Sequence, residues 1–168
     1  MIYPDVTRWP PIPGGFRHRY GIPGIIARLP APIRIVRGYR GRDGRFEIDG
    51  LSDQWLAFAQ RNDVILWNLA SGQFATWNGR AFALGEDQIG DAATCALDHC
   101  LNIFADPMTW LRASCDGIVV TDWTQAFDRL RDVSRVAVDA DILQRYHKAM
   151  VPKRLPRVFV ISKSRAAA

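Results

Sequence analysis

The sequence is poor in the residues that cross-link small proteins or bind metal ions. Its 168 residues include three cysteines and three histidines. Cys95, Cys100 and Cys115 are an odd number and form no Cys-x-x-Cys pair, which argues against a disulfide framework. We therefore expect reduced thiols and a cytoplasmic protein.

Long apolar runs are also missing. No uncharged apolar stretch approaches the roughly 18 residues that span a bilayer. The opening residues, MIYPDVTRWPPIPGG, lack the basic-then-apolar order of a signal peptide. We expect no membrane partner. The composition, 48% hydrophobic and 23% charged, excludes an intrinsically disordered chain.

Motifs for nucleotide binding and for nucleophilic catalysis are absent as well. There is no Gly-x-x-x-x-Gly-Lys-Ser/Thr loop, and GIPGIIA at 21–27 lacks the preceding strand and third glycine of a dinucleotide fingerprint. A nucleophile at Ser114 or Cys115 needs a base, and the flanking sequence places no histidine beside either residue. We expect no cofactor and favour a non-catalytic protein.

Lysine is scarce, with 3 residues against 19 arginines, and the charge is unevenly distributed. Residues 1–45 contain nine arginines and two aspartates, and residues 152–168 contain five basic groups and no acid. Residues 46–151 contain eight basic and fifteen acidic groups. Two interpretations stay open: the basic ends attract a polyanion, or they fold back onto the acidic middle.

The pattern predicts a mixed α/β (or α+β) protein with a short parallel sheet. Proline and glycine exclude a continuous helix in residues 1–32, so we predict an extended amino-terminal arm there. A single domain over 33–162 and a tail over 163–168 follow. Within that domain, residues 33–85 are predicted to be mainly β and residues 91–162 to be α/β.

The first half of this domain is predicted to contain a hairpin, a short helix and an antiparallel β-meander. The segments are IRIVRGYR at 33–40 and FEIDG at 46–50 for the hairpin, LSDQWLAFAQRN at 51–62 for the helix with Ser52 as its cap, and 63–85 for the meander with a turn at Asn78-Gly79.

The second half is predicted to contain a helical pair and then a βαβαβ unit. Helical spacing indicates one helix within 90–104, and Asp106-Pro107 indicates the start of a second. The βαβαβ unit comprises strands 117–121, 135–138 and 157–162 and helices 124–132 and 140–150.

Three aspartates follow the predicted strands of that unit. If strands 117–121 and 135–138 are neighbours, Asp122, Asp139 and Asp141 are candidate Mg²⁺ ligands for a nucleotide or phosphodiester enzyme. The alternative is that these carboxylates cap the helices that follow them. A second metal hypothesis places Cys95 and His99 on one helix face and adds Cys115 as a zinc ligand, against ordinary packing of these residues.

The most distinctive feature is a series of arginines interleaved with aromatic residues. Guanidinium groups bind phosphate oxygens, and aromatic rings stack on bases. The candidate contacts to nucleic acid or another partner are Arg17, Arg19, Arg34, Arg37, Tyr39, Arg40, Arg42, Arg45, Lys153 and Arg154. The alternative is that these arginines only solvate one strand face.

These observations predict a non-catalytic accessory protein that binds nucleic acid or a nucleoprotein complex through its basic arm and hairpin. The first alternative is a protein-interaction or inhibitor module that uses aromatic and arginine anchors. The second is the Mg²⁺-dependent enzyme described above.

Overall fold

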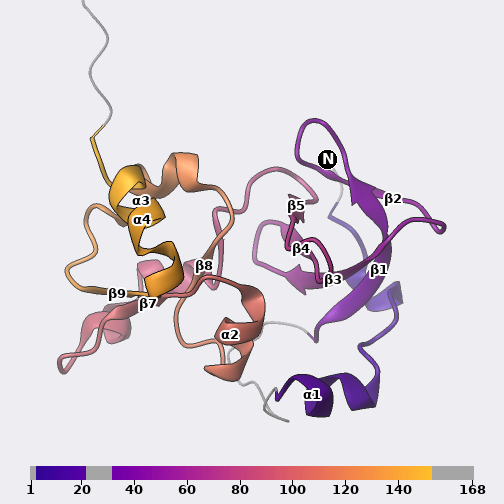
Figure 1. Ribbon diagram of the computed structural model, residues 1–168, viewed down its shortest axis with the longest axis horizontal. Helices are drawn as coiled ribbons and strands as arrows, with labels where there is room; N and C mark the ends of the chain where they lie inside the picture. The colour runs from indigo at the N-terminus through magenta and orange to yellow at the C-terminus, as the bar shows by residue number, and fades with distance from the viewer. Residues whose placement is uncertain (1–2, 22–31, 153–168) are drawn as a thin grey trace, which may run out of the picture.

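An antiparallel five-stranded sheet forms the first half of the fold (Figure 1). The computed structural model describes residues 3–21 and 32–152. The sheet has the strand order β2-β1-β3-β4-β5. Its strands are β1 (Arg34–Arg40), β2 (Phe46–Ile48), β3 (Gln54–Ala59), β4 (Val64–Asn68) and β5 (Phe74–Thr76).

The sheet curls until its two edges meet. Arg45 and Thr76 form a bridge, in which the Thr76 amide donates a hydrogen bond of 3.3 Å to the Gly44 carbonyl. The concave face encloses one core cluster: Val36, Phe46, Trp55, Ala57, Val64, Leu66 and Ala75. Trp9 and Trp77 lie against this cluster, with ring centroids 5.8 Å apart.

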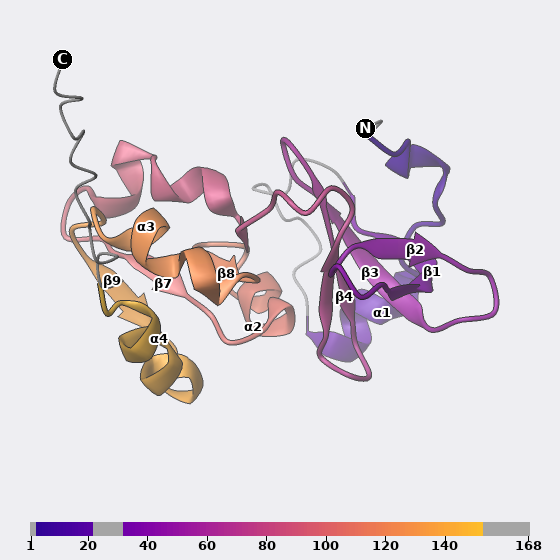
Figure 2. The same ribbon diagram turned by 90° about the horizontal axis from the view of Figure 1, so that it is seen from above.

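The convex face of the sheet packs against helices. Helix α1 (Gly14–Tyr20) lies against one part of it, and helix α2 (Pro107–Arg112) lies between the sheet and the remaining helices (Figures 1 and 2). The shared core contains Ile33, Leu56, Phe58, Ile65, Trp67, Met108, Trp110 and Leu111. The two halves of the chain are therefore joined by a continuous apolar core.

The second half contains four short strands and the helices α2, α3 (Ala126–Leu130) and α4 (Leu143–Ala149). Strands β6 (Ala83–Leu84) and β8 (Val119–Val120) pair antiparallel, and β7 (Leu101–Ile103) and β9 (Val136–Val138) pair parallel. A parallel bridge between Ile103 and Ile118 connects the two pairs.

Short 3₁₀ turns occur along the described chain, at Val6–Arg8, Glu86–Ile89, Ala92–Cys95, Trp123–Gln125 and Ala140–Ile142.

Several predictions are confirmed. The fold is mixed α/β, the 33–50 hairpin is present as β1 and β2, and α2 begins at the predicted cap. The Asp106 carboxylate accepts hydrogen bonds from the amides of Met108 and Thr109 at 2.7 and 3.0 Å. The predicted helices at 124–132 and 140–150 correspond to α3 and α4, each preceded by a 3₁₀ turn.

The helix predicted within 51–62 is wrong, because this segment is strand β3. Trp55 and Ala57 face the concave core, and Leu56 and Phe58 face the convex one, so both faces of the strand are buried. A strand buried on both faces is a continuous apolar run, which periodicity does not distinguish from a short helix. Ser52 caps no helix and instead hydrogen-bonds to Asp49.

The helix predicted within 90–104 is also wrong. The segment forms a 3₁₀ turn that ends at Cys95, and then strand β7. Leu97 and Asp98 between them have positive φ angles of 47° and 68°, which interrupt a right-handed helix. Leu97 is 92% exposed, so the apolar spacing that suggested a helix does not mark a buried face.

The remaining differences concern pairing. The meander ends at β5, because β6 pairs with β8 and no two-residue hairpin forms at Asn78-Gly79. Strand β9 is parallel, as predicted, but its partner is β7. Helix α1 lies in the arm predicted to be extended, between Pro13 and a left-handed Gly21. The predicted strand at 157–162 lies outside the described residues.

The buried carboxylate of Asp63 fixes the loop that leaves β5. Its residue exposure is 1%, and its two oxygens accept hydrogen bonds from four backbone amides. The donors are Val64 at 2.8 Å, Asn78 and Arg80 at 2.7 Å, and Ala81 at 3.1 Å. This buried carboxylate therefore ties the start of β4 to the loop that follows β5, and the four amides satisfy its two oxygens.

Gly117, two residues before β8, connects three segments of the second half by hydrogen bonds. Its amide donates to the Gln88 side chain at 2.8 Å, and its carbonyl accepts from the Trp110 indole at 2.8 Å and from the Gln88 amide group at 2.9 Å. Its φ angle is +125°, and a Cβ at this position would lie 2.3 Å from the Asn102 carbonyl oxygen. Only glycine fits here.

Candidate nucleic-acid interface

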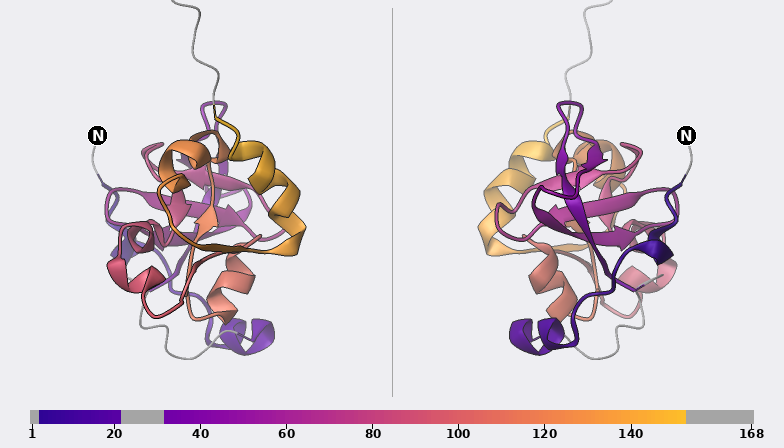
Figure 3. Two further views of the ribbon diagram at one scale, coloured as in Figure 1. Left: turned by 90° about the vertical axis from the view of Figure 1, so that its left-hand side faces the viewer. Right: turned by 90° about the vertical axis from the view of Figure 1, so that its right-hand side faces the viewer.

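The β1–β2 hairpin carries most of the predicted binding residues. Its turn is closed by hydrogen bonds from the Gly41 amide to the Arg45 carbonyl at 2.8 Å and from the Gly44 amide to the Gly41 carbonyl at 3.1 Å. Gly44 adopts a φ angle of +82°, and the Asp43 carboxylate accepts from the Arg45 amide at 3.0 Å. The hairpin projects beyond the rest of the fold (Figure 3). A defined turn therefore presents Arg40 and Arg42 to solvent.

The structure brings five of the predicted residues together on this hairpin: Arg37, Tyr39, Arg40, Arg42 and Arg45. Arg34 lies at the other end of β1, where it donates to the Trp9 carbonyl at 3.2 Å. Arg17 and Arg19 lie on α1, with the Arg19 guanidinium 5.6 Å from the Tyr20 ring centroid. Lys153 and Arg154 lie outside the described residues.

The charges of the hairpin are only partly neutralised by the protein itself. Arg45 pairs with Asp43 at 3.5 Å. Arg37, Arg40 and Arg42 form no ion pair within residues 3–21 and 32–152, although Arg37 donates to the Ser52 carbonyl at 3.0 Å. Residues 34–49 hold five arginines against Asp43, Glu47 and Asp49, so the hairpin carries net positive charge. The hairpin turn nevertheless lies beside one acid of the middle segment, because Arg40 lines a hollow together with Asp122.

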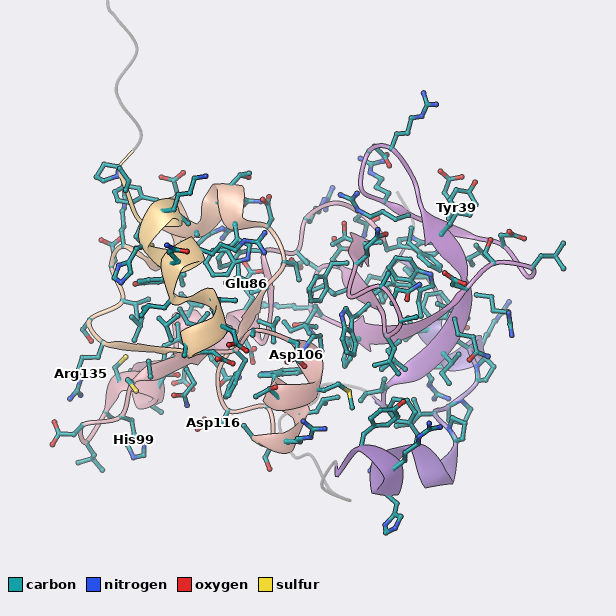
Figure 4. The ribbon with its side chains drawn as sticks, in the orientation of Figure 1. Tyr39, Glu86, His99, Asp106, Asp116 and Arg135 are labelled. Atoms are coloured by element: carbon teal, nitrogen blue, oxygen red, sulfur yellow. The ribbon has the colours of Figure 1, made fainter. Side chains whose placement is uncertain are left out.

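Tyr39 is the exposed aromatic residue of this surface, with 46% of its area accessible. Its hydroxyl donates a hydrogen bond of 2.6 Å to the Glu47 carboxylate across the strand pair. That hydrogen bond and the negative charge of Glu47 raise the pKa of Tyr39 above its usual value. Tyr39 lies on the side of the fold away from the helices of the second half (Figure 4).

The three aspartates proposed as Mg²⁺ ligands follow strands that are not neighbours, because β7 lies between β8 and β9. Asp122 accepts from the Thr124 amide at 3.0 Å and from the Gln125 side chain at 2.7 Å. Asp139 accepts from the Asp141 amide at 3.2 Å. Asp122 and Asp139 thus cap the following turns, which is the alternative interpretation.

The proposed zinc ligands are also poorly placed. The turn at Ala92–Cys95 ends before His99, so Cys95 and His99 do not share a helix face. Cys115 is fully buried in the core that joins the two halves. Within the described part of the chain, no three His, Cys, Asp or Glu side chains are grouped closely enough to hold a metal ion.

Two depressions border the hairpin, and sequence reasoning missed both. A polar hollow of about 290 Å³ lies between the hairpin turn and the end of β8, lined by Arg40, Asp43, Thr121 and Asp122 among others. A larger groove of about 630 Å³ lies between α1 and strands β1 and β3. Each is built from segments far apart in the chain, so no local sequence signal marks it.

Comparison with protein-family models, curated proteins and solved structures finds no match to this chain. In the described segments, none of the helices has the length and apolar character to traverse a bilayer.

Proposed function

We propose that this protein is a non-catalytic accessory protein that binds nucleic acid, or a nucleoprotein complex, through the β1–β2 hairpin and the basic arm. The observation that supports this most is the placement of Arg37, Arg40 and Arg42. All three are exposed and form no ion pair with the described residues; Arg40 and Arg42 lie at the projecting turn, and Arg37 lies further back on β1, beside β3.

The chemistry of these groups suits a phosphate backbone. Guanidinium groups bind phosphate oxygens with two parallel hydrogen bonds and keep their charge at any physiological pH. Phosphate contacts position a protein on nucleic acid, and an exposed aromatic ring adds stacking on unpaired bases. Tyr39 and Arg37 lie two residues apart on the same face of β1, so both kinds of contact are available on that face.

Replacing both Arg40 and Arg42 by glutamine is expected to weaken binding to a labelled DNA oligonucleotide about tenfold at 100 mM salt, because two phosphate contacts are lost. Fluorescence anisotropy measures the affinity. The matched control replaces Arg61 and Arg131 by glutamine, which removes the same charge from exposed sites outside the hairpin. Equal losses in the two variants would show that only net charge matters and would contradict a role for the hairpin.

A protein partner is the second candidate, because two large apolar side chains close to the hairpin are exposed to solvent. Ile48 at the end of β2 is 57% exposed, and Leu51 in the loop that follows is 96% exposed. Buried aromatic and arginine anchors are typical of interface hot spots. Recovery of a partner that survives nuclease treatment and is lost with Leu51→Asp would favour this candidate over nucleic acid.

A further inference from the structure

The larger groove lies directly beside the proposed phosphate-binding hairpin. One wall is α1, which contributes the half-buried rings of Phe16 and Tyr20, with centroids 4.6 Å apart. The floor is the convex face of the sheet, where Ile35 of β1 and Leu56 of β3 lie. Its volume of about 630 Å³ is in the range of small-molecule sites.

Polar groups line the rim of this groove at one side. One guanidinium nitrogen of Arg37 donates a hydrogen bond to the Ser52 carbonyl. The Asp53 carboxylate accepts a hydrogen bond of 3.2 Å from the Asn68 side chain. The Gln54 side chain is exposed beside them. The rim thus offers guanidinium and amide donors and a carboxylate acceptor, while the wall and floor are aromatic and aliphatic.

The groove is continuous with the hairpin along one strand face. Ile35, Arg37 and Tyr39 alternate on the convex side of β1, so Arg37 belongs to both surfaces. Residues four apart in a strand are separated by about 13 Å, which places Tyr39 within one or two nucleotides of the groove. Arg40 lies on the opposite, concave side, where it pairs with Phe46, so of the β1 arginines near the hairpin only Arg37 shares the face of the groove. A nucleic-acid chain that runs from the groove to the hairpin turn contacts Arg37 first.

We propose that this groove binds an unpaired base of a single-stranded nucleic acid whose phosphates contact Arg37 beside the groove and continue to the arginines of the hairpin turn. This inference rests on the proposed function. A flat base stacks on the aromatic wall or the aliphatic floor, and its hydrogen-bonding edge meets Asp53, Gln54 and Arg37. In a duplex this edge is paired and the faces are stacked, so the groove selects single strands.

The test compares a 12-nucleotide mixed-sequence DNA strand with its duplex, by fluorescence anisotropy on the full chain. The protein is expected to bind the single strand about tenfold more tightly, in the range that one base stack contributes. Ala70→Trp fills the groove from an exposed turn position and is expected to abolish this preference while leaving duplex affinity unchanged. Ser71→Trp, at the adjacent exposed position outside the groove lining, is the control and is expected to keep it.

A second variant keeps the proposal testable if Ala70→Trp loses its thermal unfolding transition. Phe16→Leu retains an apolar wall but removes the ring, and is expected to reduce single-strand affinity about fivefold with no change for the duplex. If the unmodified protein binds both forms with equal affinity, the groove does not bind a base, and the proposed hairpin interface is unaffected. Binding to neither form overturns the proposed function itself. If Ala70→Trp and Phe16→Leu fold and keep the same preference for the single strand, base binding in the groove is also contradicted.

Discussion

Substitution of Asp63 by alanine is expected to lower the free energy of unfolding by about 4 kcal/mol. The change leaves four backbone amides, of Val64 at the start of β4 and of Asn78, Arg80 and Ala81 in the loop after β5, without the carboxylate that accepts their hydrogen bonds. Each buried donor without a partner costs about 1–3 kcal/mol, and water entering the cavity restores only part of this. Urea unfolding followed by tryptophan fluorescence measures the loss.

Two further substitutions give this prediction its controls. Asp63→Asn keeps the size of the side chain, but its NH₂ group replaces one oxygen and faces two backbone amides that also donate. We therefore expect most of the loss in unfolding free energy to remain. Asp91→Ala removes an exposed carboxylate that accepts one backbone hydrogen bond, from Ala93, and is expected to cost about 1 kcal/mol or less. An Asp63→Ala protein within 1 kcal/mol of the unmodified protein would contradict the role given to this carboxylate.

Substitution of Gly117 by alanine is expected to be as damaging, through steric overlap in place of lost hydrogen bonds. The new Cβ would lie 2.3 Å from the Asn102 carbonyl oxygen and 2.7 Å from the Asn102 Cβ, at a φ angle of +125°. The Asn102 carbonyl accepts the Ile118 amide at 2.8 Å, so relief of the overlap separates β7 from β8. We expect a loss of about 4 kcal/mol and a fall in Tm of about 10 °C.

Gly90 is the matched control for this substitution. Its φ angle is −96°, and nothing lies within 4 Å of a Cβ built there. Gly90→Ala is therefore expected to change Tm by about 1 °C or less. A thermal melt in which the two variants are equally stable would show that the close approach of Gly117 to Asn102 is not required.

Local signals in the sequence predicted the elements whose boundaries depend on adjacent residues. Asp106-Pro107 marked the start of α2 because capping and the fixed φ of proline act within one turn. The hairpin of β1 and β2 followed from alternation around a glycine-containing turn. Strand β3 was missed because it is buried on both faces: the curled sheet covers Trp55 and Ala57, and α2, about 50 residues further along the chain, covers Leu56 and Phe58.

The candidate site was predicted in the same partial way. Clustering of Arg37, Arg40 and Arg42 is a property of one hairpin, so the sequence sufficed to place them. The groove forms only where α1 packs beside strands β1 and β3. No sequence pattern within these segments predicts that they lie side by side. The separation of Asp122 from Asp139 depended on β7 lying between their strands, a long-range pairing that periodicity does not reveal.

The salt dependence of binding tests the central claim most directly. Affinity for a labelled oligonucleotide is measured between 50 and 200 mM salt, for the unmodified protein and for the Arg40→Gln, Arg42→Gln variant. If the hairpin guanidinium groups contact phosphates, the logarithm of affinity falls linearly with the logarithm of salt, and the slope of the variant is smaller by about 1.5. Affinity that does not change with salt, or identical slopes for the two proteins, would contradict the proposed interface.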